Sequence, residues 1–227
     1  MSGPRWAGGW QGSIDAAQYA WLEGELESGH RSYLDRSGGR VDHDVVDRLF
    51  IAFSHHSVAT MINDFSPDGT HRYLGDDLVA LFHRFGNLIV LFDGHTHIHG
   101  VTPFPGDKGG FWEVTTASHI DWPQQARAIE IAVDETTGDL IVAARPLDHA
   151  GLIDARIGSR TDPLSLAGWS RELALNAWQG RLVDDAGADL GEPIGRGRLE
   201  DRDVLLVVPA PFAGAGVAES GPTGSGR

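Results

Sequence analysis

The chain carries short apolar runs separated by polar and glycine-containing stretches. Two runs, "LFIAF" at residues 49–53 and "NLIVLF" at residues 87–92, show no alternation of polar and apolar positions. Runs of this kind are typical of strands that are covered on both faces in an α/β sheet. Between them, residues 76–85 predict an amphipathic helix whose inner side is formed by Leu78, Leu81, Phe82 and Phe85. The order strand, helix, strand predicts a crossover unit with parallel strands.

Other segments have the periodicity of helices or strands. Residues 13–29 predict a helix that Asp15 caps and Gly29 ends. "VDHDVVDR" at residues 41–48 predicts the start of a second helix. The remaining predicted elements are a helix at 162–179 and strands at 111–117, 126–134, 139–145 and 203–210. Because residues 135–139 read as a hairpin, the second half of the sheet is expected to be antiparallel or mixed.

The organisation predicted is a single α/β domain over residues 1–210, followed by a disordered tail of small and polar residues at 211–227. No apolar run approaches the roughly 20 residues that span a bilayer, and the amino terminus has no apolar leader core. We therefore expect a cytoplasmic protein that does not engage a membrane.

The net charge and the lack of cysteine limit which partners and which metal ligands are expected. Eighteen Lys and Arg residues against 32 Asp and Glu residues give a formal net charge of -14, which would repel a phosphate backbone. Nucleic acid is therefore not an expected partner, although a metal could still attract a small phosphorylated substrate. The chain has no cysteine, so histidine and the carboxylates are its strong metal ligands.

Three histidines follow the two apolar strands. His55 comes after the first strand, and His95 and His97 stand in H-x-H order after the second, where Gly94 permits a bend. Parallel neighbouring strands end at the same sheet edge, so the three imidazoles are expected to converge there. The pattern predicts a metal site built from them.

Four further residues are candidates for supporting roles. His56 is either a hydrogen-bonding support for the ligands or only their neighbour, and Asp93 directly precedes the turn. His119 is a candidate catalytic proton donor at the same edge. Alternatively, it is an ordinary loop histidine hydrogen-bonded to Asp121, which is itself a candidate for orienting a ligand.

Two of these segments carry a family resemblance. "FSHHS" (53–57) and "DGHTHIHG" (93–100) resemble the last two metal-binding blocks of calcineurin-like metallophosphoesterases. Residues 8–26, 109–131, 169–176 and 199–208 are similar to stretches of an actinobacterial-type subfamily, so the resemblance extends over about residues 8 to 208. It implies a hydrolase for a small phosphoester that uses two divalent cations of Mn, Fe or Zn, with His55 and His95 on one metal and His97 on the other.

The sequence departs from this family at its start. The family's D-x-H, G-D-x-x-D and G-N-H-D or G-N-H-E blocks, which supply the bridging carboxylate and an asparagine, are absent. Three neutral imidazoles cannot offset the repulsion between two adjacent cations. We therefore expect the carboxyl-terminal part of an α/β/β/α sandwich with a mixed sheet, whose amino-terminal half is missing and whose apolar sheet edge or face is exposed.

Three hypotheses follow. The first is a metallophosphoesterase whose full site, and any export signal, lies in a longer product. The second is an inactive remnant or subunit that binds at most one metal and completes the fold of another chain, which would supply the missing half. The third is a mononuclear zinc hydrolase that uses only His55, His95 and His97.

Overall fold

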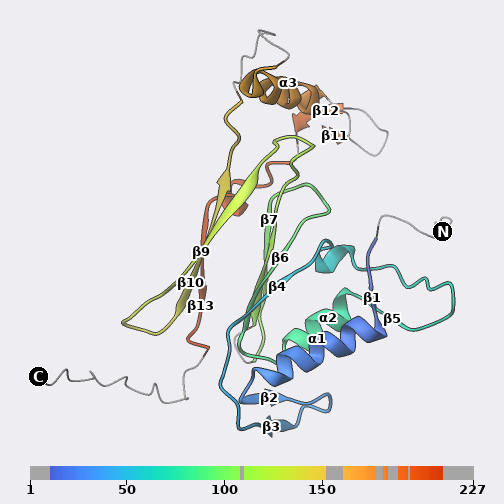
Figure 1. Cartoon of the computed structure of the whole chain (residues 1–227), viewed down its shortest axis with the longest axis vertical. Helices are drawn as coiled ribbons and strands as arrows, with labels where there is room; N and C mark the ends of the chain where they lie inside the picture. The colour runs from blue at the N-terminus through green and yellow to red at the C-terminus, as the bar shows by residue number, and fades with distance from the viewer. Residues whose placement is uncertain are drawn as a thin grey trace, which may run out of the picture.

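A computed structural model describes residues 11–107, 110–151, 161–176, 181–183, 189–193 and 195–211. These residues form a mixed α/β structure with several small sheets and few helices. The arrangement places two helices, a central sheet and a second sheet side by side as three layers (Figure 1). The α/β class predicted from the sequence is confirmed at this level.

The central sheet has four strands in the order β4-β6-β8-β7. They are β4 (Phe50–Phe53), β6 (Leu88–Asp93), β8 (Phe111–Thr115) and β7 (Gly100–Phe104). The first three run parallel and β7 is antiparallel to β8, which confirms the mixed sheet. Helix α2 (Gly75–Phe82) connects β4 to β6 as the predicted crossover.

Helices α1 (Ala16–Ser28) and α2 cover one face of this sheet (Figure 1). The predicted caps of α1 are confirmed, because Asp15 Oδ1 accepts a hydrogen bond from Gln18 N at 2.7 Å and Gly29 ends the helix. The apolar layer beneath the helices includes all four side chains expected on the inner side of the second helix, Leu78, Leu81, Phe82 and Phe85.

A second, antiparallel sheet lies on the opposite face (Figure 1). It consists of β13 (Val204–Val208), β10 (Leu140–Leu147) and β9 (Ala126–Val133) in that order, and its β9–β10 hairpin was predicted. Its buried side chains pack on those of the central sheet in a second apolar layer formed by Ile89, Val90, Phe92, Val114, Leu140, Val142, Ala144, Leu206 and Val208.

Shorter elements complete the described chain. Helix α3 (Pro163–Asn176) confirms the last predicted helix and lies beyond the ends of β9 and β10 (Figure 1). Two-stranded pairs are β1 (Ile14–Asp15) with β5 (Arg72–Tyr73), β2 (Ser32–Leu34) with β3 (Arg40–Asp42), and β11 (Arg181–Val183) with β12 (Asp189–Pro193). Single 3-10 turns occur at Val58–Thr60 and Leu199–Asp201.

Two predictions about elements were wrong. Residues 41–48 do not begin a helix, because β3 pairs with β2 and the intervening turn is fixed by Asp35, whose Oδ1 accepts from the backbone of Ser37 and Gly39. Strand β4 is an edge strand, and one of its faces is uncovered, because Ile51 is 37% exposed and Phe53 is 76% exposed. The expected exposed apolar edge is therefore present at β4.

Two further predictions concern membrane-spanning helices and the carboxyl-terminal tail. No helix among the described residues is both long and apolar enough to cross a bilayer. The predicted disordered tail, apart from residue 211, lies outside the described residues.

Candidate metal centre

The histidines meet at the carboxyl edge of the central sheet. His55 and His56 follow β4 after Ser54, and His95 follows β6 after Gly94. Since these strands are neighbours and parallel, their carboxyl ends lie side by side, as predicted. Gly94 N donates a hydrogen bond to His55 O at 3.2 Å and ties the two strand-end loops together.

The imidazoles have the spacing of metal ligands. His55 Nε2 lies 3.2 Å from His95 Nδ1. A tetrahedral ion with metal–nitrogen distances of about 2.0–2.1 Å separates its ligand nitrogens by about 3.3 Å. His56 completes a group of three in which the ligand nitrogens all lie within 4.8 Å of one another.

The turn that carries His95 is held in an uncommon backbone conformation. His95 has φ 63° and His97 has φ 58°, both in the left-handed region. The bend therefore falls on the histidines themselves and not on Gly94, where the sequence pattern placed it. Non-glycine residues in this region cost on the order of 1 kcal/mol each and persist where the surroundings hold them.

His56 is positioned by the nearby Thr60 and by Gly12, which is distant in the sequence. Its Nδ1 lies 3.3 Å from Thr60 Oγ1, and Gly12 N donates to Thr60 O at 3.0 Å. A Cβ atom at Gly12 would lie 2.4 Å from the His56 ring, so the close approach requires glycine. The sequence pattern left open whether His56 was only a neighbour, and the structure places it in the group.

The environment favours neutral imidazoles. Burial, and then the proximity of His95 and His55, lower the pKa of His56 below its usual value. Burial, and then His55 and His97, lower the pKa of His95 in the same way. Neutral imidazole is the form that binds a metal, so these rings are ready to act as ligands near neutral pH.

His97 and Asp121 form a separate pair. His97 Nδ1 lies 2.5 Å from Asp121 Oδ2, and His97 is not part of the three-histidine group. The carboxylate therefore fixes the ring and leaves Nε2 available on the other side. Asp121 does orient a histidine, but that histidine is His97 and not His119.

Asp93 lies behind the turn and is buried. Burial, reinforced by the neighbouring Glu113 carboxyl, raises the pKa of Asp93 to about 8. Neither oxygen of Asp93 has a hydrogen bond of normal geometry within the described part of the chain, whereas Glu113 Oε1 accepts from Val58 N at 2.7 Å. A metal ion would therefore have to displace the proton of Asp93 before this carboxylate could act as a ligand.

His119 lies in a different place from the three-histidine group. It is exposed and lines a hollow between the turn after β8, the end of β10 and α3. It is not a member of the histidine group, so the structure does not bring this candidate proton donor together with the expected ligands.

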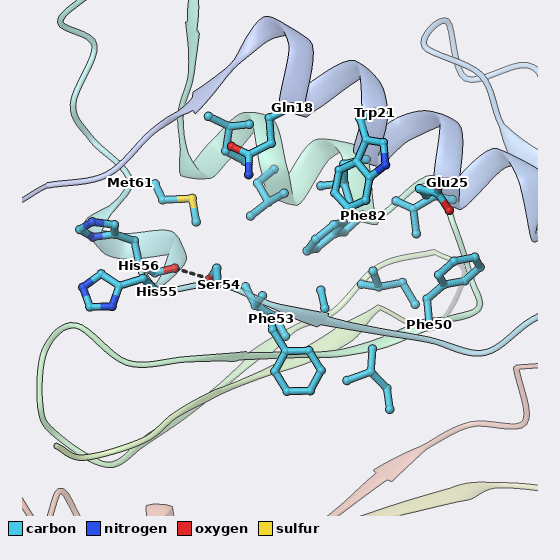
Figure 2. A pocket seen from close by; sticks show the side chains of 18 of the residues that line it. Gln18, Trp21, Glu25, Phe50, Phe53, Ser54, His55, His56, Met61 and Phe82 are labelled. Carbon is cyan, nitrogen blue, oxygen red and sulfur yellow. Dashed lines mark hydrogen bonds between the residues drawn. The ribbon is translucent and has the colours of Figure 1, made fainter. Parts of the chain in front are cut away.

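An apolar groove begins at the histidines. It has a volume of about 620 Å³ and runs between α1 and β4, with Trp21 on the helix side and His55 and His56 at one end (Figure 2). Ser54 Oγ donates to His56 O at 2.6 Å at the same end. A ligand or chain segment in this groove would approach the histidine group directly.

Comparison with known proteins assigns no family. Neither a scan against protein-family models nor a search of the curated proteins finds a match for this chain. The chemistry of the site therefore rests on its own geometry, which is that of three imidazoles with no carboxylate in the same group among the residues that the structure describes.

Proposed function

We propose that this chain provides the histidine side of the metal centre of a metal-dependent phosphoester hydrolase. The observation that supports the proposal is the 3.2 Å separation of His55 Nε2 and His95 Nδ1, with His56 beside them, at the carboxyl ends of two parallel strands. The resemblance of "FSHHS" and "DGHTHIHG" to metallophosphoesterase blocks supplies the reaction class.

The residues have distinct roles in this proposal. His55, His56 and His95 hold a divalent cation of Zn, Mn or Fe through neutral ring nitrogens. When bound, such a cation supplies Lewis-acid polarisation of a phosphoryl oxygen and a water acidified toward neutral pH. Asp121 accepts the Nδ1 proton of His97, so that the Nε2 of His97 is free to bind or to accept a proton.

The described chain is suited to one cation and not to two. No carboxylate joins the histidine group within the described residues. Two divalent cations a few ångströms apart repel each other strongly unless an anionic ligand lies between them. The two-metal centre implied by the resemblance therefore requires a carboxylate from outside this group.

Metal stoichiometry tests the proposal. The tag-free chain is equilibrated with Zn, Mn or Fe and analysed for bound metal beside His55→Ala, His95→Ala and the control His71→Ala. His71 is exposed and outside the group. We expect about one metal per chain, lost in the first two variants and kept in the control. Binding that survives both substitutions, or no binding at all, would contradict the proposal.

A second candidate function is that of a subunit that completes another chain's fold, and β4 is the observation that favours it. Phe50 N and Ser54 N donate to Asn87 O and Phe92 O beside β6. Because backbone groups alternate sides along a strand, those of Ile51 and Phe53 point away from β6, toward the open edge. A strand added at the open edge of β4 would meet both the backbone groups of Ile51 and Phe53 and the apolar groove.

Co-expression with a chain that carries the D-x-H and G-N-H blocks tests this second function. The unchanged protein and Val133→Lys, which adds a charge on the exposed surface of β9, are expected to form the complex. Phe53→Lys is expected to prevent it, because a charge at a strand edge opposes strand addition. A complex that tolerates Phe53→Lys would exclude β4 as the contact.

A further inference from the structure

His30 is a buried histidine that the metal centre does not use. It directly follows Gly29, which ends α1, and it is 0% exposed. Its ring stacks on Phe50 of β4 and lies against Phe85 after α2, with ring centroids 5.1 Å and 4.9 Å away. The ring therefore lies where the end of α1 meets the central sheet.

Two hydrogen bonds fix His30 in one neutral form. Asn87 N donates to His30 Nε2 at 3.0 Å, so Nε2 carries no proton. The ring proton is therefore on Nδ1, which donates to Leu26 O at 2.6 Å. Both nitrogens are satisfied only while the ring is neutral, because a protonated ring has two donors and no acceptor.

Asn87 extends this contact to both neighbouring strands. It directly precedes β6, and its carbonyl accepts from Phe50 N of β4 at 2.8 Å. Its side-chain Nδ2 donates to Asp47 Oδ1 at 2.9 Å. The end of α1 is therefore fastened, through His30 and Asn87, to the amino-terminal ends of β4 and β6.

The charges around His30 favour its neutral form. The charged side chains on the segments that contact it are Glu27 and Arg31 beside it in the sequence, Asp47 and Arg48 before β4, and Arg84 after α2. Arg31 and Arg48 are exposed, and Arg84 pairs with Glu27 at 3.5 Å. Burial lowers the pKa of His30 below its usual value, and the hydrogen bond to Leu26 O and the charge of Asp47 oppose this only in part.

Protonation of His30 would break this arrangement. The added proton would be on Nε2, where it would face the N–H of Asn87, so that two donors would meet without an acceptor. A positive charge would also be enclosed at a position with no exposure to water. Either the ring or Asn87 must then move, and both movements separate the end of α1 from the sheet.

The same end of α1 forms a wall of the apolar groove. Phe50, which stacks on His30, lines the groove at the end away from the three-histidine group (Figure 2). Trp21 and Leu26 of α1 also line it. Loss of the His30 contacts would therefore free the helix side of the groove.

We propose that His30 is an acid-sensitive latch, whose protonation releases the carboxyl-terminal end of α1 from the central sheet and opens the apolar groove. The latch is closed at neutral pH, where His30 is uncharged. Below about pH 6.5, the usual pKa of histidine, the open form gains stability because it binds the proton more tightly than the closed form. This device depends neither on a metal nor on the proposed hydrolase function.

Amide hydrogen exchange of the full, metal-free chain tests the latch. The hydrogen bond of the Asn87 amide must break on opening, which takes up one proton. Its protection factor is therefore expected to fall by up to ten-fold per pH unit from about pH 6.5 to about pH 5. The Val142 amide, in β10 of the second sheet, is expected to show no such fall. A pH-independent protection factor at Asn87, or an equal fall at Val142, would overturn the proposal.

The variant His30→Gln removes the titration and keeps the hydrogen-bonding groups. The glutamine oxygen can accept from Asn87 N, and its NH₂ can donate to Leu26 O. The pH dependence at Asn87 is therefore expected to disappear in His30→Gln and to remain in the control His71→Gln, which changes an exposed histidine. The same pH dependence in both variants would refute the role of His30.

A titration of the unchanged chain keeps the proposal testable if His30→Gln does not fold. The Cε1–H signal of His30 is followed by NMR as the pH is lowered. We expect it to titrate below the usual pKa of histidine, together with the loss of protection at Asn87. Titration at or above the usual pKa would contradict the latch.

The opening itself is measured with two spin labels. The chain has no cysteine, so Ser28→Cys at the end of α1 and Val133→Cys on the second sheet provide the two labelled positions. Pulsed electron spin resonance is expected to show a second distance between the labels at about pH 5 that is not seen at about pH 7.5. Addition of His30→Gln is expected to remove this second distance. The same distance at both pH values would show that α1 stays on the sheet and would overturn the proposal.

Discussion

His95 and His97 show how the site depends on single residues. Both have left-handed backbone conformations that histidine adopts at a cost, and each is held by a contact that opposes relaxation. Gly94 N bonds to His55 O on one side of the turn, and Asp121 bonds to the ring of His97 on the other. The rings are therefore placed before any ligand arrives.

Gly12 offers a test of this placement. The substitution Gly12→Ala would place a methyl group 2.4 Å from the His56 ring. The ring must therefore move out of the group. We expect zinc affinity to fall about ten-fold, as when a group that orients a ligand is lost. Competition with a chelating dye measures the affinity.

Gly24→Ala is the matched control for this substitution. Gly24 lies on the exposed side of α1, and no atom lies within 4 Å of the added methyl. We expect unchanged zinc affinity and a free energy of unfolding that is higher by about 1 kcal/mol, because alanine favours a helix over glycine. Unchanged affinity in both variants would show that Gly12 does not position His56.

At the scale of elements, the sequence predicted the helices and strands whose cap or apolar pattern lies within one short segment. The α1 helix has its cap and its apolar face within one stretch, and β6 is an unbroken apolar run, so both were predicted. Strand β7 was missed because Gly100 and Pro103 hide its pattern, and it is an edge strand where proline is tolerated. The hairpin of β2 and β3 was missed because it depends on the turn at Asp35.

The cap of α1 gives a prediction at this scale. Replacing Asp15 by alanine removes the oxygen that accepts from Gln18 N, and we expect the free energy of unfolding to fall by about 1 kcal/mol. Asp15→Asn keeps an accepting oxygen and is expected to stay close to the unchanged chain. Urea unfolding measures both variants, and equal losses would show that the cap is not the cause.

At the scale of the whole molecule, the central sheet links two apolar layers and carries the site at its carboxyl edge. The sequence predicted that His55 and His95 would meet there, because parallel strand order alone requires it. It could not predict that His56 would join them or that His97 would bind Asp121. Both contacts depend on how loops far apart in the sequence fold back, through Gly12 in one case and through the turn after β8 in the other.

The buried carboxyl of Asp93 makes global stability depend on pH. Its pKa is about 8 when folded and near 3.8 when unfolded, so the folded chain binds the proton more tightly. The stabilisation is complete below about pH 4 and is lost as the pH rises to about 8. Asp93→Asn mimics the protonated form and should escape this loss.

Urea unfolding at several pH values measures this effect. Relative to the unchanged chain, Asp93→Asn is expected to gain at least about 1 kcal/mol in free energy of unfolding between pH 4 and pH 8. Asp42→Asn, at an exposed carboxyl, is expected to show no such gain over the same range. A pH-independent difference between the Asp93 variant and the unchanged chain would contradict the raised pKa.

The groove between α1 and β4 is lined by Trp21, whose fluorescence depends on whether the groove is filled. Trp21 lies on its wall and is 61% exposed, so its indole is in contact with water. A strand or ligand that fills the groove would displace that water and shift the fluorescence emission of Trp21 to shorter wavelengths. The chain has seven tryptophans, and the difference between its spectrum and that of Trp21→Phe isolates this signal. The fluorescence of Trp21 therefore reports whether the groove is occupied.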